Sequence, residues 1–360
     1  MRPLLEDPRA LEGLTSVRVV REPFLAPRVV AIGGQTGCGK SLFPPIIGSL
    51  RGVELPAYNY TVEYLCALQF LGKIAEDAVV TLIRMLTDLE LYHIVQSRGV
   101  NFRVSDLSSV FRNTGTWRYI RRLFQAGDAA AVERIRCEQP ILQLTIHNAL
   151  SFGRPLFDAL GDRLRLVEIV RHPLYMVKQG LLYYRMYGAD PREFSLWIDH
   201  RGQALPYFAK GWEERYASSS AMDRVIYSME RLSQLAREVR EGLPAPWRAH
   251  ILSVPFERFV LDPWPWLRQI EQCVGTQTTW QTRRHLRRQR VPRMRIADGV
   301  PLPLYKRFGW EPADKRVDER GELEKRRQFA AKDASPEAMT VLDRLCADYE
   351  ATHLNGAIQW

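Results

Sequence analysis

The sequence predicts an α/β domain in which helices flank a central parallel sheet in three layers. A β-branched apolar run at residues 29–32 leads directly into a glycine-rich segment. Two further apolar runs, at residues 141–146 and 164–170, have strand character, and residues 155–160 between them are compatible with a helix. A strand, a helix and a second strand at this separation indicate a crossover between parallel strands.

The remaining elements follow from apolar periodicity and from turn residues. Residues 16–20 have strand character, and a later strand is expected at residues 250–256. Helices are expected at residues 42–50 and at 61–98, the latter as one or two long helices. After a polar segment at 101–110, a helical stretch is expected through about residue 135. Further helices are expected at 173–187, 222–241 and 335–349.

The 360 residues contain no internal repeat and no low-complexity linker, so we expect a single domain. Within it, residues 1–27 form an N-terminal lead-in and residues 61–135 a mainly helical insertion. Residues 276–360 form a basic and helical C-terminal extension, which includes seven arginines between positions 283 and 295.

Composition narrows the class of protein. Lys and Arg number 51 against 41 Asp and Glu, and this net charge of +10 favours an anionic partner such as a nucleotide, an acidic polymer, nucleic acid or an anionic membrane face. The five cysteines form no C-x-x-C pair, which argues against a zinc site or a disulfide framework. No apolar run reaches the length of a membrane span or of a signal-peptide core, so we expect a cytoplasmic protein.

The glycine-rich segment fits the phosphate-loop pattern G-x-x-x-x-G-K-[ST] at every fixed position. Glycines let backbone N–H groups turn inward around an anion, while the lysine and the following helix add positive charge. Pro44 and Pro45 come soon after the loop, so the helix start is short or displaced. The expected anion-binding residues are Gly34, Gln35, Thr36, Gly37, Cys38, Gly39, Lys40 and Ser41.

Two more polar residues are expected beside this loop. His147 follows the strand at 141–146, and Arg171 follows the strand at 164–170. Because ligands bind outside the carboxyl ends of the strands in parallel sheets, the loop, His147 and Arg171 are predicted to share one pocket.

The order of these motifs resembles the sulfotransferases that use 3′-phosphoadenosine 5′-phosphosulfate. The phosphate loop is followed by His147, by an R-x-P segment that starts at Arg171, and by the sequence FERFVLDP at residues 256–263. The resemblance covers roughly residues 28–275. It implies sulfuryl transfer to a hydroxyl or amine of a carbohydrate or another small molecule, without a metal.

The resemblance also implies roles for individual residues. Lys40 and the loop would bind the 5′-phosphosulfate and stabilise charge, and Lys40 and His147 would be catalytic, with His147 as the general base. Arg171 would pair with the 3′-phosphate. Gln179 is assigned to the same phosphate, at a position where the family commonly has serine, and Tyr175 stands where the family often has aspartate.

Two other functions remain open from the sequence. Lys40 and Ser41 also suit the phosphates and Mg²⁺ of ATP or GTP, which favours a small-molecule or sugar kinase. No apolar strand ends in an aspartate that would hold this Mg²⁺. A non-catalytic polyanion-binding protein is the third reading, supported by the net charge and the arginine run, although no nucleic-acid-binding motif is present.

Overall fold

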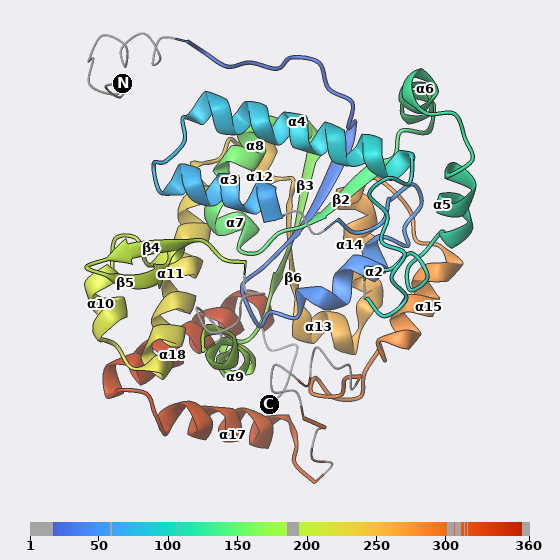
Figure 1. Cartoon of the computed structure of the whole chain (residues 1–360). Coiled ribbons are helices and arrows are strands. Elements are labelled where there is room, and N and C mark those ends of the chain that lie inside the picture. The colour runs from blue at the N-terminus through green and yellow to red at the C-terminus, as the bar shows by residue number, and fades with distance from the viewer. Residues whose placement is uncertain are drawn as a thin grey trace.

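A computed structural model of the chain describes residues 17–57, 60–106, 108–185, 194–300, 306, 311, 312, 314 and 316–354. At its centre is a four-stranded parallel sheet in the order β2-β1-β3-β6 (Figure 1). Its strands are β1 (Arg28–Gly33), β2 (Ile141–Thr145), β3 (Leu164–Val170) and β6 (Ile251–Pro255). The predicted strands at 29–32, 141–146 and 164–170 are confirmed, and β1 lies between the other two.

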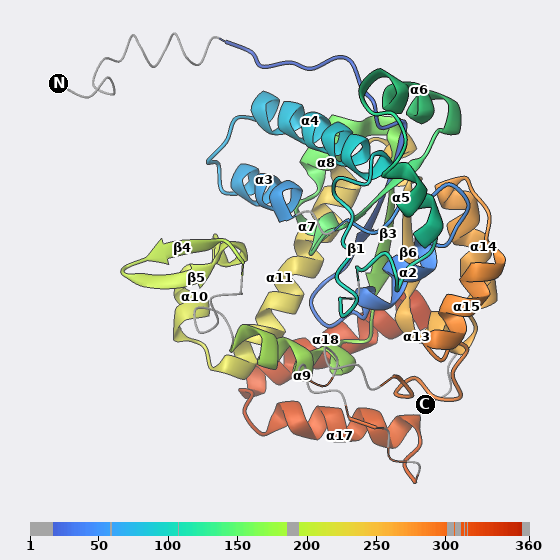
Figure 2. The same cartoon turned by 45° about the vertical axis from the view of Figure 1, so that its right-hand side comes forward.

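Helices cover both faces of this sheet, as Figure 2 shows. Side chains alternate along β1, so that Val29 and Ala31 enter one core cluster while Val30 and Ile32 enter another. On the first face lie α3 (Tyr60–Phe70), α4 (Glu76–Val95), α7 (Ala149–Phe152), α8 (Arg154–Leu160) and α11 (Ala221–Gly242). On the second face lie α2 (Phe43–Ile47), α13 (Phe256–Leu261), α14 (Pro263–Val274) and α15 (Trp280–Arg288).

The other elements surround these layers. A third apolar cluster joins α9 (Pro173–Tyr184), α17 (Glu319–Ala331) and α18 (Pro336–Tyr349) to α11. The elements around the layers are α5 (Thr116–Arg122), α6 (Asp128–Glu138), α9 (Pro173–Tyr184), α10 (Glu213–Ser218), α12 (Ala245–Arg248), α17 (Glu319–Ala331), α18 (Pro336–Tyr349) and the antiparallel pair β4 (Trp197–His200) and β5 (Gln203–Pro206).

Three sequence-based expectations are corrected. Residues 17–20 form no strand, because their backbone bonds to side chains of α4: the Val19 N–H donates to Asp77, and Thr81 donates to the Val19 carbonyl. The helix expected at 42–50 is only the five-residue α2 after a 3₁₀ turn at Lys40–Leu42. The last strand ends at Pro255, and Glu257 belongs to α13.

Candidate active site at the carboxyl edge of the sheet

The phosphate loop follows β1 and is packed so closely that its glycines are required. Gly34 has a φ of 138°, and a β-carbon there would lie 2.5 Å from both Cys38 Sγ and the Ile169 carbonyl oxygen. Gly39 has a φ of 85°, and its β-carbon would lie 2.4 Å from the Phe256 ring. Both conformations favour glycine, which lets the loop pack against β3 on one side and α13 on the other.

Lys40 supplies the positive charge of this loop. Its side chain is 9% exposed, and Nζ donates a hydrogen bond to the Gly34 carbonyl oxygen at 3.1 Å. The same oxygen accepts the Asn148 N–H at 3.2 Å. Lys40 and the residue after His147 are thus joined through one carbonyl group. Since α2 has only five residues, the helix dipole adds less to the loop than the sequence predicts.

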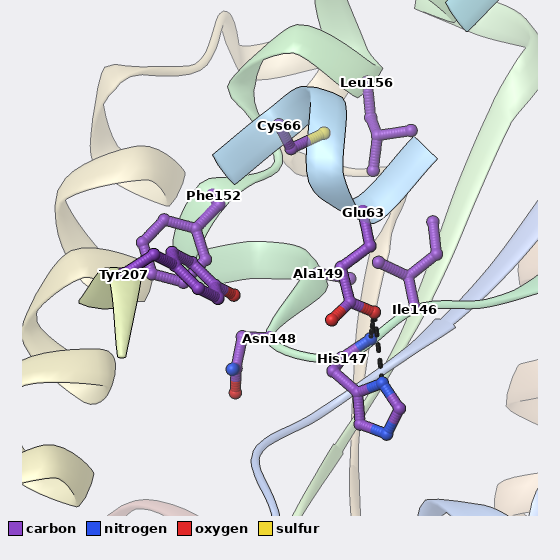
Figure 3. A pocket seen from close by; sticks show the side chains of 9 residues that line it. All are labelled: Glu63, Cys66, Ile146, His147, Asn148, Ala149, Phe152, Leu156 and Tyr207. Carbon is purple, nitrogen blue, oxygen red and sulfur yellow. Dashed lines mark hydrogen bonds and ion pairs between the residues drawn. The ribbon is translucent and has the colours of Figure 1, made fainter. Parts of the chain in front are cut away.

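His147 follows β2 and is held by a carboxylate from α3. Both its backbone N–H and its Nδ1 bond to Glu63 Oε2, at 2.8 and 3.0 Å. The ring of Tyr60 lies nearly parallel to the imidazole, with centroids 6.3 Å apart. Figure 3 shows the other ring nitrogen of His147 pointing away from Glu63. Glu63 and His147 border a small pocket lined also by Cys66, Ile146, Asn148, Ala149, Phe152, Leu156 and Tyr207.

Arg171 follows β3 and reaches back to the phosphate loop. Its Nη1 donates to the Gly37 carbonyl oxygen at 3.0 Å, and its Nε lies 3.8 Å from Glu257 Oε1. The side chain is 15% exposed, and in the described part of the chain the buried Nε makes no hydrogen bond. Burial lowers the pKa of Arg171, an effect that Glu257 opposes.

Two further arginines approach Arg171 through shared aromatic rings. The Arg171 guanidinium carbon lies 4.3 Å from the centroid of Phe256 and 5.1 Å from that of Tyr175. Arg326 of α17 lies 4.3 Å from the Tyr175 ring, and Arg293 lies 5.5 Å from the Phe256 ring. Three arginines from distant parts of the sequence therefore concentrate positive charge beside the phosphate loop.

Glu257 of α13 fixes the junction between β3 and α9. It is fully buried, and it accepts the His172 N–H at 3.1 Å and the Tyr349 hydroxyl at 2.6 Å. Burial, followed by the Glu257 charge, raises the pKa of Tyr349. The carboxylate therefore connects the start of α9 with α18, and it also faces Arg171.

A second buried carboxylate lies under the loop. Glu168 on β3 is paired in register with Gly33, and its Oε2 has no hydrogen-bond partner within the described residues. Burial raises the pKa of Glu168 to about 8, whereas Lys40 and Arg240 act to lower it. The sequence places this residue within a strand and gives no sign of its proximity to Lys40.

The side chains of Gln35 and Gln179 lie away from this arrangement, whereas Cys38, Thr36 and Ser41 belong to the loop. The Gln35 amide donates to Ser233 Oγ on α11 at 2.9 Å and so points away from the loop. Gln179 is half-buried on α9, and among the described residues no hydrogen bond or ion pair links it to the loop. Cys38 is buried, and burial raises the pKa of its thiol. Thr36 and Ser41 are half-buried at the loop.

The predicted arginine run is divided by the fold. Arg293 belongs to the cluster near Arg171, and Arg295 donates to the Asp314 carbonyl oxygen at 2.7 Å. The exposed members of the run are Arg283, Arg284, Arg287, Arg288 and Arg290. Arg326 carried no signal in the sequence, because it sits in a charged helix that resembles an ordinary solvated one.

Fold and loop together define a three-layer α/β domain of the P-loop type. The structure is similar to the sulfotransferase domain from the curacin biosynthetic pathway, with 11% identity, a TM-score of 0.41, and coverage of 90% of this chain and 98% of that one. It is also similar to sulfotransferase STF9 from Mycobacterium avium, with 14% identity, a TM-score of 0.41, and coverage of 92% and 77% respectively. The sulfotransferase domain of a Synechococcus olefin synthase matches with 16% identity, a TM-score of 0.34, and coverage of 87% and 100%.

No protein-family model and no curated protein sequence matches the chain. None of the described helices combines the length and the apolar character needed to cross a lipid bilayer. The described residues also contain no cluster of three or more His, Cys, Asp or Glu side chains suited to a metal ion.

Proposed function

We propose that the protein is a sulfotransferase that transfers a sulfuryl group from 3′-phosphoadenosine 5′-phosphosulfate to a hydroxyl or amine of a carbohydrate or small-molecule acceptor. One observation carries this proposal: the phosphate loop is contacted from both neighbouring strand ends. Asn148, next to His147, donates to Gly34, and Arg171 donates to Gly37. These contacts support the assignment of His147 as a proton acceptor and of Arg171 as a buried cation beside a loop suited to an anion.

The residues present fit a donor with two anionic ends. The glycine loop and Lys40 would bind the phosphosulfate, and Arg171, whose buried Nε makes no hydrogen bond within the described chain, would pair with the 3′-phosphate. Arg293 and Arg326 add positive charge near Arg171 and would favour the same phosphate. In the related family, position 175 is often aspartate and position 179 commonly serine. Arg293 and Arg326, held on the Phe256 and Tyr175 rings, could bind the phosphate in place of that serine hydroxyl.

The donor supplies a sulfuryl group on a phosphate leaving group. His147 would take the proton of the acceptor as the acceptor oxygen or nitrogen bonds to sulfur. The bond between sulfur and the bridging oxygen breaks, and its electron pair stays on the departing phosphate oxygen. Lys40 and the loop N–H groups would stabilise the charge on that oxygen. General-base catalysis of this kind contributes about 10²–10⁴-fold to the rate.

A thermal-shift comparison tests the donor class. We expect 3′-phosphoadenosine 5′-phosphate to raise the melting temperature with or without Mg²⁺, and ATP to raise it less. Stabilisation only by ATP with Mg²⁺ would overturn the proposal. That outcome would favour the second candidate, an ATP- or GTP-dependent kinase, which the complete sequence G-x-x-x-x-G-K-S at residues 34–41 supports.

A His147 variant tests the proposed base. We expect His147→Ala to bind 3′-phosphoadenosine 5′-phosphate as the parent protein does and to lose sulfuryl transfer from the phosphosulfate donor. His93→Ala, which alters a half-buried histidine near the end of α4, is the matched control. An unchanged rate in the His147 variant would refute the assigned role.

A further inference from the structure

We infer that Glu63 is a positioning residue that fixes the ring orientation and the tautomer of His147. The inference rests on the proposed function for its catalytic meaning, but its structural content can be tested separately. Glu63 was not singled out by the sequence, because it lies 84 residues before His147 within a helix of mixed composition.

The contact between the two residues is doubly anchored. A single carboxylate oxygen, Glu63 Oε2, accepts the backbone N–H of His147 at 2.8 Å and lies 3.0 Å from its Nδ1. The backbone bond fixes the position of the residue, and the ring bond fixes the side-chain torsion. The Glu63 side chain is 13% exposed, so water competes weakly for its oxygens.

Helix α3 holds this carboxylate firmly in place. Val62, Leu65 and Cys66, which flank Glu63, are buried in the first core cluster. Tyr60 lies one turn before Glu63, and its ring is inclined by only 11° to the imidazole. The orientation of His147 is therefore set by a rigid helix, whereas His147 itself lies on the segment that follows β2.

The hydrogen bond also determines which ring nitrogen can accept a proton. An ionised carboxylate only accepts hydrogen bonds, so Nδ1 must carry the proton. In the neutral imidazole the unprotonated atom is then Nε2, which points away from Glu63 (Figure 3). When Nε2 takes the proton of the acceptor, the adjacent Glu63 carboxylate stabilises the resulting imidazolium.

The other ionisable groups of the pocket do not compete for this role. Burial raises the pKa of Cys66 to about 12, and burial likewise raises the pKa of Tyr207 well above its ordinary value. Both side chains are therefore neutral near pH 7. Glu63 and His147 are thus the pair in this pocket that can carry charge and move a proton.

Three substitutions separate geometry from charge. Glu63→Gln keeps an oxygen that can accept both bonds but removes the charge, and Glu63→Ala removes both. Glu63→Asp keeps the charge on a shorter side chain. We expect kcat to fall by about 10–10²-fold in Gln and by about 10²–10⁴-fold in Ala, with partial recovery in Asp. The KM of the donor should change less than twofold in all three variants.

Nitrogen NMR of His147 provides a readout that needs no turnover. We expect the ring to be protonated at Nδ1 in the parent protein and in Glu63→Gln, and to shift toward the Nε2-protonated form in Glu63→Ala. Glu76→Gln, at an exposed position on α4, is the matched control. A parent ring protonated at Nε2, or an unchanged kcat in Glu63→Ala, would overturn the inference. Absence of sulfuryl transfer with the Nδ1 form intact would instead count against the proposed function.

Discussion

The Arg171 Nη1 donates a hydrogen bond to the carbonyl oxygen of Gly37 at 3.0 Å. This bond ties the end of β3 to the phosphate loop that follows β1. A guanidinium that uses one N–H for the loop keeps its other donors for a ligand bound beside it. The bond also holds the guanidinium close enough to the loop to attract an anion bound there.

We predict that Arg171→Ala weakens the binding of 3′-phosphoadenosine 5′-phosphate much more than the binding of adenosine 5′-monophosphate. A hydrogen bond to a charged group contributes about 1.5–3 kcal/mol, which corresponds to roughly 10–150-fold in affinity. Titration calorimetry with both nucleotides measures the difference. Arg283→Ala, on the exposed face of α15, should leave both affinities unchanged. Equal losses for the two nucleotides would show that Arg171 does not read the 3′-phosphate.

We predict that Arg326→Ala reduces affinity for the same 3′-phosphorylated nucleotide by a smaller factor. Arg326 stacks on Tyr175 and contributes charge near Arg171, with its own ion pair to Glu322 at 3.6 Å. Because this charge acts at longer range, we expect a loss of about 2–5-fold that shrinks as salt is raised. Calorimetry at two ionic strengths tests this, and a loss that does not change with salt would contradict it. Arg327→Ala, whose side chain pairs with Asp343, is the neighbouring control.

We predict that Lys40→Met lowers affinity for both nucleotides by at least about 10-fold while the fold persists. Lys40 donates to the Gly34 carbonyl oxygen and supplies the charge at the loop itself, so both nucleotides depend on it. Methionine preserves the aliphatic part of this buried side chain. The same calorimetric titrations measure the loss, with the circular dichroism spectrum as the control for folding. Selective loss of only one nucleotide would contradict the assignment of Lys40 to the shared 5′ end.

The strands and the polar residues that follow them could be predicted because each strand of the parallel sheet is a short continuous run of apolar residues in the sequence. An apolar run followed by a glycine, a histidine or an arginine is visible in a few residues, and parallel pairing brings those ends together. Glu63, Arg326 and Glu168 could not be predicted in the same way. Each lies in a helix or strand of ordinary composition. Its place in the site depends on a neighbouring residue from an element distant in the sequence: His147 for Glu63, Tyr175 for Arg326 and Lys40 for Glu168.

The length of the helix after the loop was overestimated for a local reason. Residues 42–50 have helical composition, but Pro44 and Pro45 restrict the backbone, and the α-helix ends at Ile47. The chain then turns at Gly48 toward Ser49, whose hydroxyl donates to Ile46. The dipole of this short helix therefore contributes less to binding an anion in the loop than a helix over residues 42–50 would. Under the proposed function, Lys40 and the backbone N–H groups provide more of that binding energy.

We predict that Glu54→Ala destabilises the fold by about 3–5 kcal/mol, the usual effect of breaking a buried ion pair. Glu54 accepts from Arg122 Nη1 at 2.8 Å and from the Tyr119 hydroxyl at 2.6 Å, which joins α5 to the segment beside β2. Removing it leaves the buried Arg122 guanidinium with only the half-exposed Glu138 carboxylate, 3.4 Å away, as a charge partner. Urea unfolding measures the change. Glu133→Ala, on the exposed face of α6, should alter stability by less than about 0.5 kcal/mol. A similar small change in the Glu54 variant would contradict the prediction.

We predict that Glu168→Gln removes a pH dependence of stability. Burial raises the pKa of Glu168 from 4.5 to about 8, so the folded protein holds this proton more tightly than the unfolded chain. The associated stability is fully present below about pH 4.5 and is lost as pH rises through about 8.

Glutamine at position 168 imitates the protonated form of the glutamate at every pH. We therefore expect the two proteins to have similar free energies of unfolding near pH 4.5, and the variant to be increasingly more stable up to about pH 8. Urea unfolding at a series of pH values checks this, with the exposed Glu76→Gln as the control. Parallel curves for Glu168→Gln and the parent would show that this carboxyl is ionised in the folded protein at neutral pH.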